Sequence, residues 1–155
     1  MELYANNVFR LVFRTLRNHA DAEDVVQLSF EVLWKNVAAI PIEKARSYLF
    51  TVATRRAIDQ IRRQKKVTHV ADFASSGQPE PLAPERADAH ELHEQLHAAL
   101  NTLPETQRAC ILLRDYEGYS YHEIGEMLTL SESQVKVYIF RGRQKLQELL
   151  RGIRF

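Results

Sequence analysis

A proline-rich stretch near the middle of the chain most constrains what this sequence can fold into. Residues 71–85, ADFASSGQPEPLAPE, hold three of the five prolines, one of the five glycines and two serines. This composition is typical of a linker, because proline and glycine interrupt helices and strands. The sequence therefore predicts two small domains, residues 1–66 and 89–155, joined by a flexible linker at residues 67–88.

Helical periodicity dominates on both sides of this stretch. No alternating run bounded by turn residues predicts a strand. We expect helices over residues 2–17, from an N-cap at Asp21 to about Asn36, over 45–66 after the break at Pro41, and again from about Arg86. The expected fold class is all-α.

The C-terminal segment has the spacing of a helix-turn-helix. Ser120 and Ser131 are placed to cap two successive helices, and Glu123 would complete a capping box with Ser120. Gly125 lies where the two helices must approach closely. On a helical wheel, one sector of the second helix is predicted to be buried and holds Val135, Ile139, Gly142, Leu146, Leu149 and Leu150.

The opposite face of this second helix is the candidate DNA-reading surface. Val137 and Phe140 are unusual on a face that is merely solvated, whereas contact with thymine methyl groups would explain them. A protein partner would explain them equally well, and both readings stay open. The candidate DNA-contacting residues on this helix are Ser133, Gln134, Lys136, Val137, Phe140 and Arg141.

Two basic segments suggest contacts with a polyanion. Residues 43–66 hold eight Lys/Arg against two Asp/Glu, and residues 136–155 hold six against one, although the net charge of the chain is only +1. The alternative is that both are solvated helix faces. Within the first segment a stripe at helical spacing contains Thr51, Arg55, Asp59, Arg62 and Lys66, with Arg56 and Arg63 beside it.

The HELHEQLHAAL stretch matches the HExxH pattern of zinc hydrolases at His93 and His97. The wheel places both residues, with His90, on the polar flank of an apolar helix face, so we expect solvated side chains and neither a catalytic metal nor another cofactor. A regulatory metal or a pH response of the three histidines is the alternative. Cys110, the one cysteine, lies in an apolar helix and is predicted to be a buried thiol in a reducing compartment.

Four motifs in order resemble one family. They are DAEDVVQLSF (21–30), YLFTVATRRAIDQIRR (48–63), LPETQRACILLRDYEGYSYHEIGEML (103–128) and the second helix of the helix-turn-helix. The chain resembles bacterial RNA polymerase sigma factors of the extracytoplasmic-function (ECF) group. The resemblance implies a cytoplasmic, non-enzymatic transcription factor that binds the polymerase core and promoter DNA.

The resemblance also assigns roles by position. The segment matching 21–34 would dock on the clamp helices of the core, although three of its apolar residues could instead be hydrophobic core. The loop at residues 37–44 would receive a flipped base, and the C-terminal helix-turn-helix would read the −35 element. The candidates for core binding are Asp24, Gln27, Phe30, Leu33 and Trp34. Those for the −10 element are Tyr48, Thr51, Arg55, Arg56, Asp59, Arg62 and Arg63.

Two departures from the family pattern carry expectations of their own. Arg55 stands where relatives usually have Asn, which favours a phosphate contact there. Thr129 stands where the turn usually has Gly, and because a β-branched residue is poor at positive φ, a different turn geometry is expected.

A cognate anti-sigma protein, often bound to a membrane, is the further partner implied, and no small-molecule substrate is expected. A stand-alone helix-turn-helix regulator remains the alternative.

Overall fold

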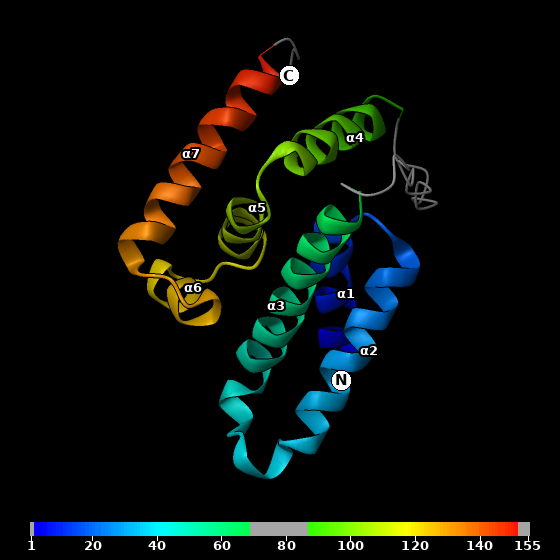
Figure 1. The fold of residues 1–155 in the computed structure, drawn as a ribbon, viewed down its shortest axis with the longest axis vertical. Helices are drawn as coiled ribbons and strands as arrows, with labels where there is room; N and C mark the ends of the chain where they lie inside the picture. Colours follow the sequence, from blue (N-terminus) through cyan, green and yellow to red (C-terminus); the bar gives the residue numbers. More distant parts are fainter. Residues whose placement is uncertain (1, 69–86, 152–155) are drawn as a thin grey trace. The chain divides into compact units, whose positions relative to one another are not determined.

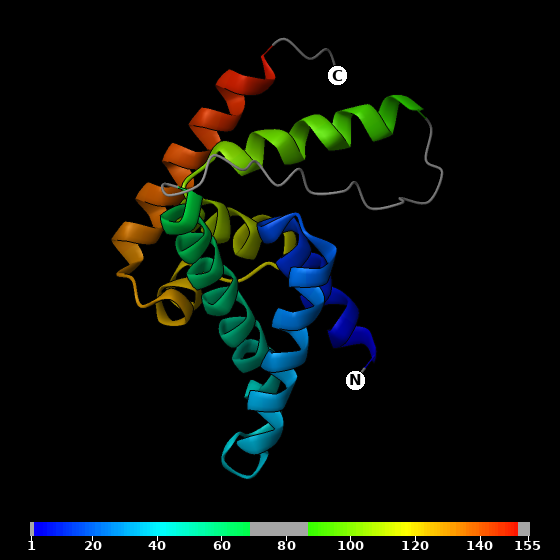
Figure 2. The ribbon, with the colours of Figure 1, turned by 45° about the vertical axis from the view of Figure 1, so that its right-hand side comes forward.

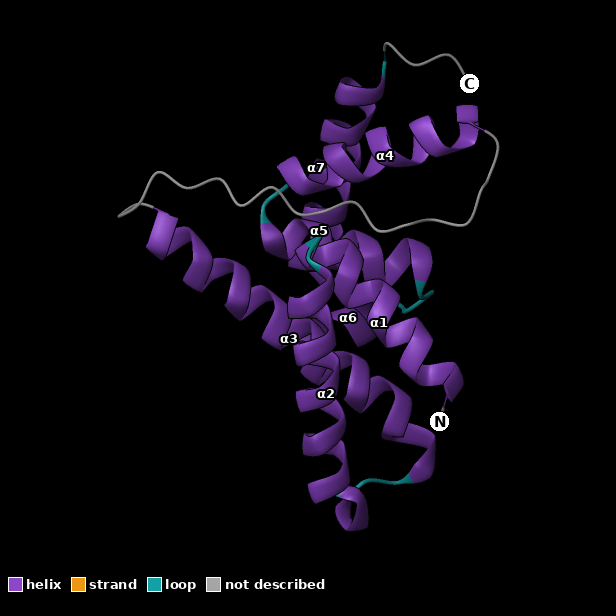
Figure 3. Ribbon diagram, turned by 90° about the vertical axis from the view of Figure 1, so that its right-hand side faces the viewer, coloured by secondary structure: helices purple, strands orange, loops and turns teal. Residues whose placement is uncertain are grey.

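The chain consists of helices grouped in two units. The computed structural model describes residues 2–68 and 87–151, and the chain divides into compact units at Met1–Pro79 and Glu80–Phe155. Every secondary-structure element of the described residues is helical, as the absence of strand colour in Figure 3 shows. The all-α prediction is therefore confirmed, whereas most of the predicted linker lies outside the described residues.

The N-terminal unit is a bundle of three helices. Helices α1 (Glu2–Leu16), α2 (His19–Lys35) and α3 (Ile42–Thr68) each pack against the other two. In Figure 1, α2 and α3 lie side by side and are joined at one end by the cyan segment. The apolar faces of the three helices meet in a core that includes Leu11, Val12, Leu49, Phe50 and Ala53, whose side chains are nearly inaccessible to solvent.

The turn between α1 and α2 corrects the predicted start of the second helix. Arg17 adopts a left-handed conformation (φ 56°) and donates its backbone N–H to the Phe13 carbonyl at 2.7 Å, which ends α1. Asn18 then caps α2, because its Oδ1 accepts the Asp21 N–H at 3.0 Å. Asp21 therefore lies in the first turn, where its negative charge interacts favourably with the positive end of the helix dipole. Both side chains suit an N-cap, and the sharp turn at Arg17 selects the earlier one.

The connection from α2 to α3 is shorter than predicted. A single 3-10 turn, η1 (Val37–Ala39), follows α2, and α3 begins at Ile42 rather than at residue 45. The Lys44 N–H donates to the Pro41 carbonyl at 2.9 Å, so Pro41 stands directly before the first turn. Proline is well suited to the start of a helix because it lacks a backbone N–H, and an N–H there would have no helical partner.

The C-terminal unit is built around one long helix. Its elements are α4 (Ala87–Thr102), α5 (Glu105–Ile111), the π-helical turn η2 (Leu112–Tyr116), α6 (Tyr121–Leu128) and α7 (Glu132–Leu150). Helix α7 packs against α4, α5 and α6. Figure 2 shows α6 at the N-terminal end of α7.

A buried arginine joins α4 to α5. Arg108 donates from Nε to the Leu100 carbonyl at 3.0 Å and from Nη2 to the carbonyls of Asn101 and Leu103 at 2.9 and 3.1 Å. Leu100 and Asn101 lie in the last turn of α4 and Leu103 directly follows it, so the arginine binds the C-terminal end of this helix, where carbonyls run short of backbone donors. The Leu100 carbonyl also accepts the Leu103 N–H at 3.1 Å. Burial lowers the pKa of Arg108, an effect that the nearby Glu105 carboxylate opposes.

Helix α7 buries only a narrow strip. Val135, Ile139 and Gly142 are buried, and a Cβ on Gly142 would collide with the side chain of Ile111 in α5. The missing side chain therefore allows the two helices to approach. The predicted burial is wrong for Leu149, which is 43% exposed, and Leu146 and Leu150 are only half-buried.

The turn of the helix-turn-helix is held by paired caps. Ser120 forms a capping box with Glu123, and Ser131 forms one with Gln134, so both predicted caps are confirmed. Thr129 takes the left-handed conformation (φ 57°, ψ 50°), so the expected change of turn geometry is wrong. The Leu130 N–H donates to the Gly125 carbonyl at 2.8 Å, and this bond closes the turn in spite of the β-branched residue.

The histidine pair on α4 also departs from the prediction. His97 is 1% exposed and is not on a solvated flank, and its Nε2 lies 2.9 Å from Nε2 of His93. Its side chain shares the buried side of α4 with Ala99 and Leu100. The wheel misplaced it because the centre of the buried sector depends on which helix covers α4, and local periodicity does not reveal that.

We expect Gly125→Ala to destabilise the C-terminal unit. A Cβ at this position would lie 2.7 Å from the Leu130 carbonyl oxygen, so the backbone of the turn would have to move. The cost should be about 1–3 kcal/mol, typical of forced overpacking. Hydrogen exchange of the α6 and α7 amides would measure it, with Glu126→Ala at the neighbouring exposed position as the control. Equal protection in both variants would contradict the prediction.

Cys110 should make stability depend on alkaline pH. Burial raises the pKa of its thiol from 9.0 to about 12. Because the folded pKa is higher than the unfolded one, the thiol's contribution is fully present below pH 9.0 and is lost as the pH rises toward about 12. Urea unfolding of the wild type and of Cys110→Ala, between about pH 8 and about pH 11, should show a steeper loss in the wild type. Parallel curves would contradict the assignment.

Candidate functional site

An apolar groove lies where α2 meets α3 through η1. Its volume is about 1000 Å³, and most of the lining side chains are hydrophobic. Trp34 at its edge is 69% exposed and Ile42 is 89% exposed. Large apolar side chains gathered at one exposed place indicate a surface that another molecule covers. The lining residues are Gln27, Phe30, Glu31, Leu33, Trp34, Lys35, Val37, Ile40, Ile42 and Ala45.

The structure brings most of the predicted core-binding residues together in this groove. Gln27, Phe30, Leu33 and Trp34 line it, whereas Asp24 is exposed on α2 outside the lining. The alternative that Trp34 belongs to the hydrophobic core is wrong, because most of its side chain is accessible.

Sequence reasoning missed the other half of the groove wall. Val37, Ile40, Ile42 and Ala45 come from the connection and from the first turn of α3. Their signal was present as an apolar run around Pro41, but we assigned that run to base capture alone. Because the connection is short, residues of both predicted functions share one wall.

The predicted −10 stripe follows the outward side of α3. Arg55, Asp59, Arg62 and Arg63 are exposed, whereas Tyr48, Thr51 and Arg56 are half-buried. Thr51 donates its hydroxyl to the Ser47 carbonyl at 2.6 Å. The other side of α3 is buried at Leu49, Phe50, Ala53, Ala57, Ile58 and Ile61.

Arg46 extends the cationic surface of α3 toward the groove. Its guanidinium lies over the Phe50 ring, 4.7 Å from the ring centroid. Stacking on an aromatic ring fixes the orientation of a guanidinium while it stays charged. This residue was not among the sequence candidates.

All six predicted −35 residues are exposed on α7. Phe140 is 68% exposed and Val137 is 43% exposed, which is unusual for large apolar side chains. Ser133, Gln134, Lys136 and Arg141 are exposed on the same helix. The exposed surface therefore combines apolar, amide and cationic groups, the types that contact thymine methyls, base edges and phosphates.

Two of these six residues have a structural partner as well. The Gln134 side-chain oxygen accepts the Ser131 N–H at 2.9 Å, which completes the second capping box. Lys136 pairs with Glu132 at 3.7 Å, and its Nζ lies 5.8 Å from the centroid of the Tyr121 ring on α6. These three contacts stabilise the N-terminal part of α7, the part of such a helix that enters a DNA groove.

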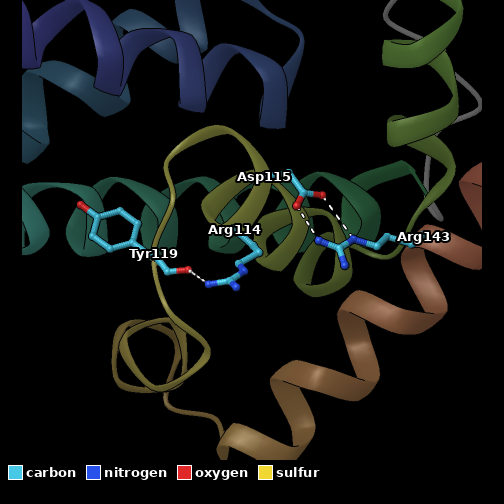
Figure 4. A network of polar contacts seen from close by, with 4 residues as sticks. All are labelled: Arg114, Asp115, Tyr119 and Arg143. Carbon is cyan, nitrogen blue, oxygen red and sulfur yellow. Dashed lines mark hydrogen bonds and ion pairs between the residues drawn. The ribbon is translucent and has the colours of Figure 1, made fainter.

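A polar network beneath the helix-turn-helix was also missed. Arg143 on α7 donates to Asp115 at 2.6 Å, and Arg114 donates to the Tyr119 carbonyl at 3.0 Å (Figure 4). The hydrogen bond from Arg143 to Asp115 raises the pKa of the arginine. Asp115 and Arg143 are 28 positions apart, so no local pattern connects them.

Neither a metal centre nor a membrane span is found among the described residues. In residues 2–68 and 87–151, no group of three or more His, Cys, Asp or Glu side chains could hold a metal ion. In the same part of the chain, no helix is long and apolar enough to cross a membrane.

Comparisons with known proteins match both halves of the chain. The Sigma-70 region 2 family model matches residues 1–67, and the Sigma-70, region 4 model matches residues 93–146. The ECF RNA polymerase sigma factor SigW of Bacillus subtilis is 30% identical over 165 residues, which cover 99% of this chain and 88% of the relative. The RNA polymerase sigma factor CarQ of Myxococcus xanthus is 32% identical over 148 residues, which cover 95% and 84%. The chain belongs to the ECF sigma factors.

A solved structure confirms the fold of this ECF sigma factor. The sigma factor RpoE of Bartonella quintana, solved in complex with the anti-sigma factor NepR, superposes with a TM-score of 0.77 at 24% identity, over 98% of this chain and 94% of that one. The chain spans only 58% of the ECF RNA polymerase sigma factor SigE of Mycolicibacterium smegmatis, to which it is 32% identical. The family resemblance stated from the sequence is thus confirmed.

Proposed function

We propose that this ECF sigma factor binds the polymerase core through the groove between α2 and α3, and that α3 and α7 recognise the −10 and −35 elements. Residues 1–66 would bind the core and open the −10 region, residues 67–88 would link the domains, and residues 89–155 would read the −35 element. The observation that carries the proposal is the exposed α7 surface, with Phe140 68% exposed on a capped helix-turn-helix.

The chain acts in this proposal by binding and performs no reaction of its own. It works in the bacterial cytoplasm, where the core and the promoter are found. Weak binding to DNA in the absence of the core is expected, because the two basic segments are short and the net charge is only +1. An anti-sigma protein, itself membrane-bound or free, would cover the exposed groove or the α7 surface.

Run-off transcription tests the proposal directly. Purified core polymerase is combined with fragmented DNA of the source organism, with and without the chain. New transcripts that require the chain, with start sites preceded by shared −10 and −35 sequences, are the expected result. Tight, sequence-specific DNA binding by the chain alone, with no new transcripts, would favour the stand-alone regulator.

Trp34→Ala should weaken core binding while leaving the fold intact. Because Trp34 is 69% exposed, its loss removes few folding contacts. If the polymerase core covers the groove, Trp34 becomes buried in the interface, where an aromatic hot spot contributes about 2 kcal/mol or more to binding. Titration of the core against the labelled chain would measure the loss, and circular dichroism would confirm the helix content. Tyr4→Ala, an exposed aromatic on α1 outside the groove lining, is the control.

Arg141→Ala should reduce transcription from promoters that carry the −35 element. The residue is exposed beside Phe140, and one lost contact to a phosphate or base edge should cost about 1–3 kcal/mol. A uniform loss over all −35 sequences would indicate a phosphate contact, and relaxed sequence preference a base contact. Arg151→Ala removes the same charge at the far end of α7 and serves as the control. Unchanged transcription would refute the assignment of α7.

A further inference from the structure

Two neighbouring residues of the π-helical turn hold α6 and α7 in place. Asp115 accepts two hydrogen bonds from Arg143, at 2.6 Å from Nη2 and at 3.4 Å from Nε. Arg114, the preceding residue, donates to the Tyr119 carbonyl at 3.0 Å. In Figure 4 the two side chains leave the same turn toward different partners, one toward α7 and the other toward the segment before α6.

The base of this network is anchored in the core of the C-terminal unit. Leu112 and Leu113, which start the π-helical turn, are fully buried, and the Glu117 N–H donates to the Leu112 carbonyl at 3.3 Å. These contacts stabilise the turn that carries Arg114 and Asp115. Wide turns of this kind often occur at functional sites.

Arg114 contacts the helix-turn-helix at the start of α6. Its guanidinium lies 4.5 Å from the centroid of the Tyr121 ring, and Lys136 of α7 lies 5.8 Å from the same centroid. The Tyr119 carbonyl that it binds directly precedes Ser120, the N-cap of α6. One arginine thus contacts the start of α6 and, through Tyr121, the first turn of α7.

Asp115 fixes α7 at a second point. Arg143 follows Gly142, which has no room for a side chain against Ile111 of α5. Apolar contacts are not directional, so the strip at Val135, Ile139 and Gly142 fixes the rotation of α7 about its axis less strictly than a directional contact does. Two hydrogen bonds from a planar guanidinium to one carboxylate are directional and oppose such rotation.

We propose that Asp115 is a positioning residue for promoter recognition: its ion pair with Arg143 sets the rotation of α7 and thereby aims Val137, Phe140 and Arg141 at the DNA. The inference rests on the proposed −35 reading by α7. Asp115 does not touch DNA in this scheme, so its effect is exerted through Arg143.

The sign of the mutational effect separates this role from simple electrostatics. Asp115→Asn removes a negative charge from a unit that binds a polyanion, so electrostatics alone predicts equal or tighter DNA binding. Loss of positioning predicts the opposite, a weaker use of the −35 element. Glu148→Gln, the same chemical change at an exposed position on α7, is the matched control.

The experiment measures transcription by the full chain with the core, on one promoter with its −35 element intact and on the same promoter with that element scrambled. For Asp115→Asn the ratio of activity on the intact promoter to activity on the scrambled promoter should fall by roughly two- to five-fold. This is the change expected from the free energy of one exposed ion pair. The control should keep the wild-type ratio, and Asp115→Glu, which keeps the carboxylate, should restore most of it. Circular dichroism at the assay temperature should show equal helix content.

Two outcomes would overturn the inference. One is an Asp115→Asn ratio equal to that of the control, which is also what an equal loss on both promoters would give. The other is failure of Asp115→Glu to recover the ratio. If the wild type itself responds equally to intact and scrambled −35 elements, the proposed reading by α7 fails instead, and the wild-type measurement separates that failure from the others.

Discussion

The one-sided burial of α7 is the constraint on which the C-terminal unit depends. Val135, Ile139 and Gly142 face the other helices, and the missing Cβ at Gly142 gives Ile111 of α5 the space that it occupies. A wider buried strip would cover Val137 and Phe140, which the proposed function needs in solvent. A narrow strip stabilises less, because the hydrophobic contribution grows with buried apolar area. Caps and ion pairs then add the directional contacts that apolar packing lacks.

The N-terminal unit likewise leaves apolar side chains exposed, at the ends of α2 and α3 that η1 joins. Its core is well buried along the helices, but the short connection at η1 leaves Trp34, Val37 and Ile42 exposed around a groove. Exposed apolar surface favours association with other molecules and aggregation. In the described part of each unit, an exposed apolar surface is therefore available, and the proposed function assigns each of these surfaces to a partner.

Local interactions could be predicted well from the sequence. The predicted caps at Ser120 and Ser131 join residues three positions apart, and the close approach at Gly125 follows from the turn that they define. The same reasoning failed at Asn18 and Asp21, because both are good N-caps and the turn at Arg17 decided between them. For the candidate site, periodicity and the family resemblance predicted the exposed residues of α7 and four of the five residues proposed to bind the core.

The sequence by itself determined the all-helical fold, the caps at Ser120 and Ser131 and the membership in the sigma family, since these depend on residues close along the chain or on motifs in order. Only the tertiary structure decided that His97 is buried, that Arg108 binds the end of α4 and that Asp115 pairs with Arg143. Each of these depends on which helix covers which face. That choice arises from packing between residues distant in the sequence. Helical periodicity gives the orientation of a side chain on its own helix, but it does not show which other helix that side chain will pack against.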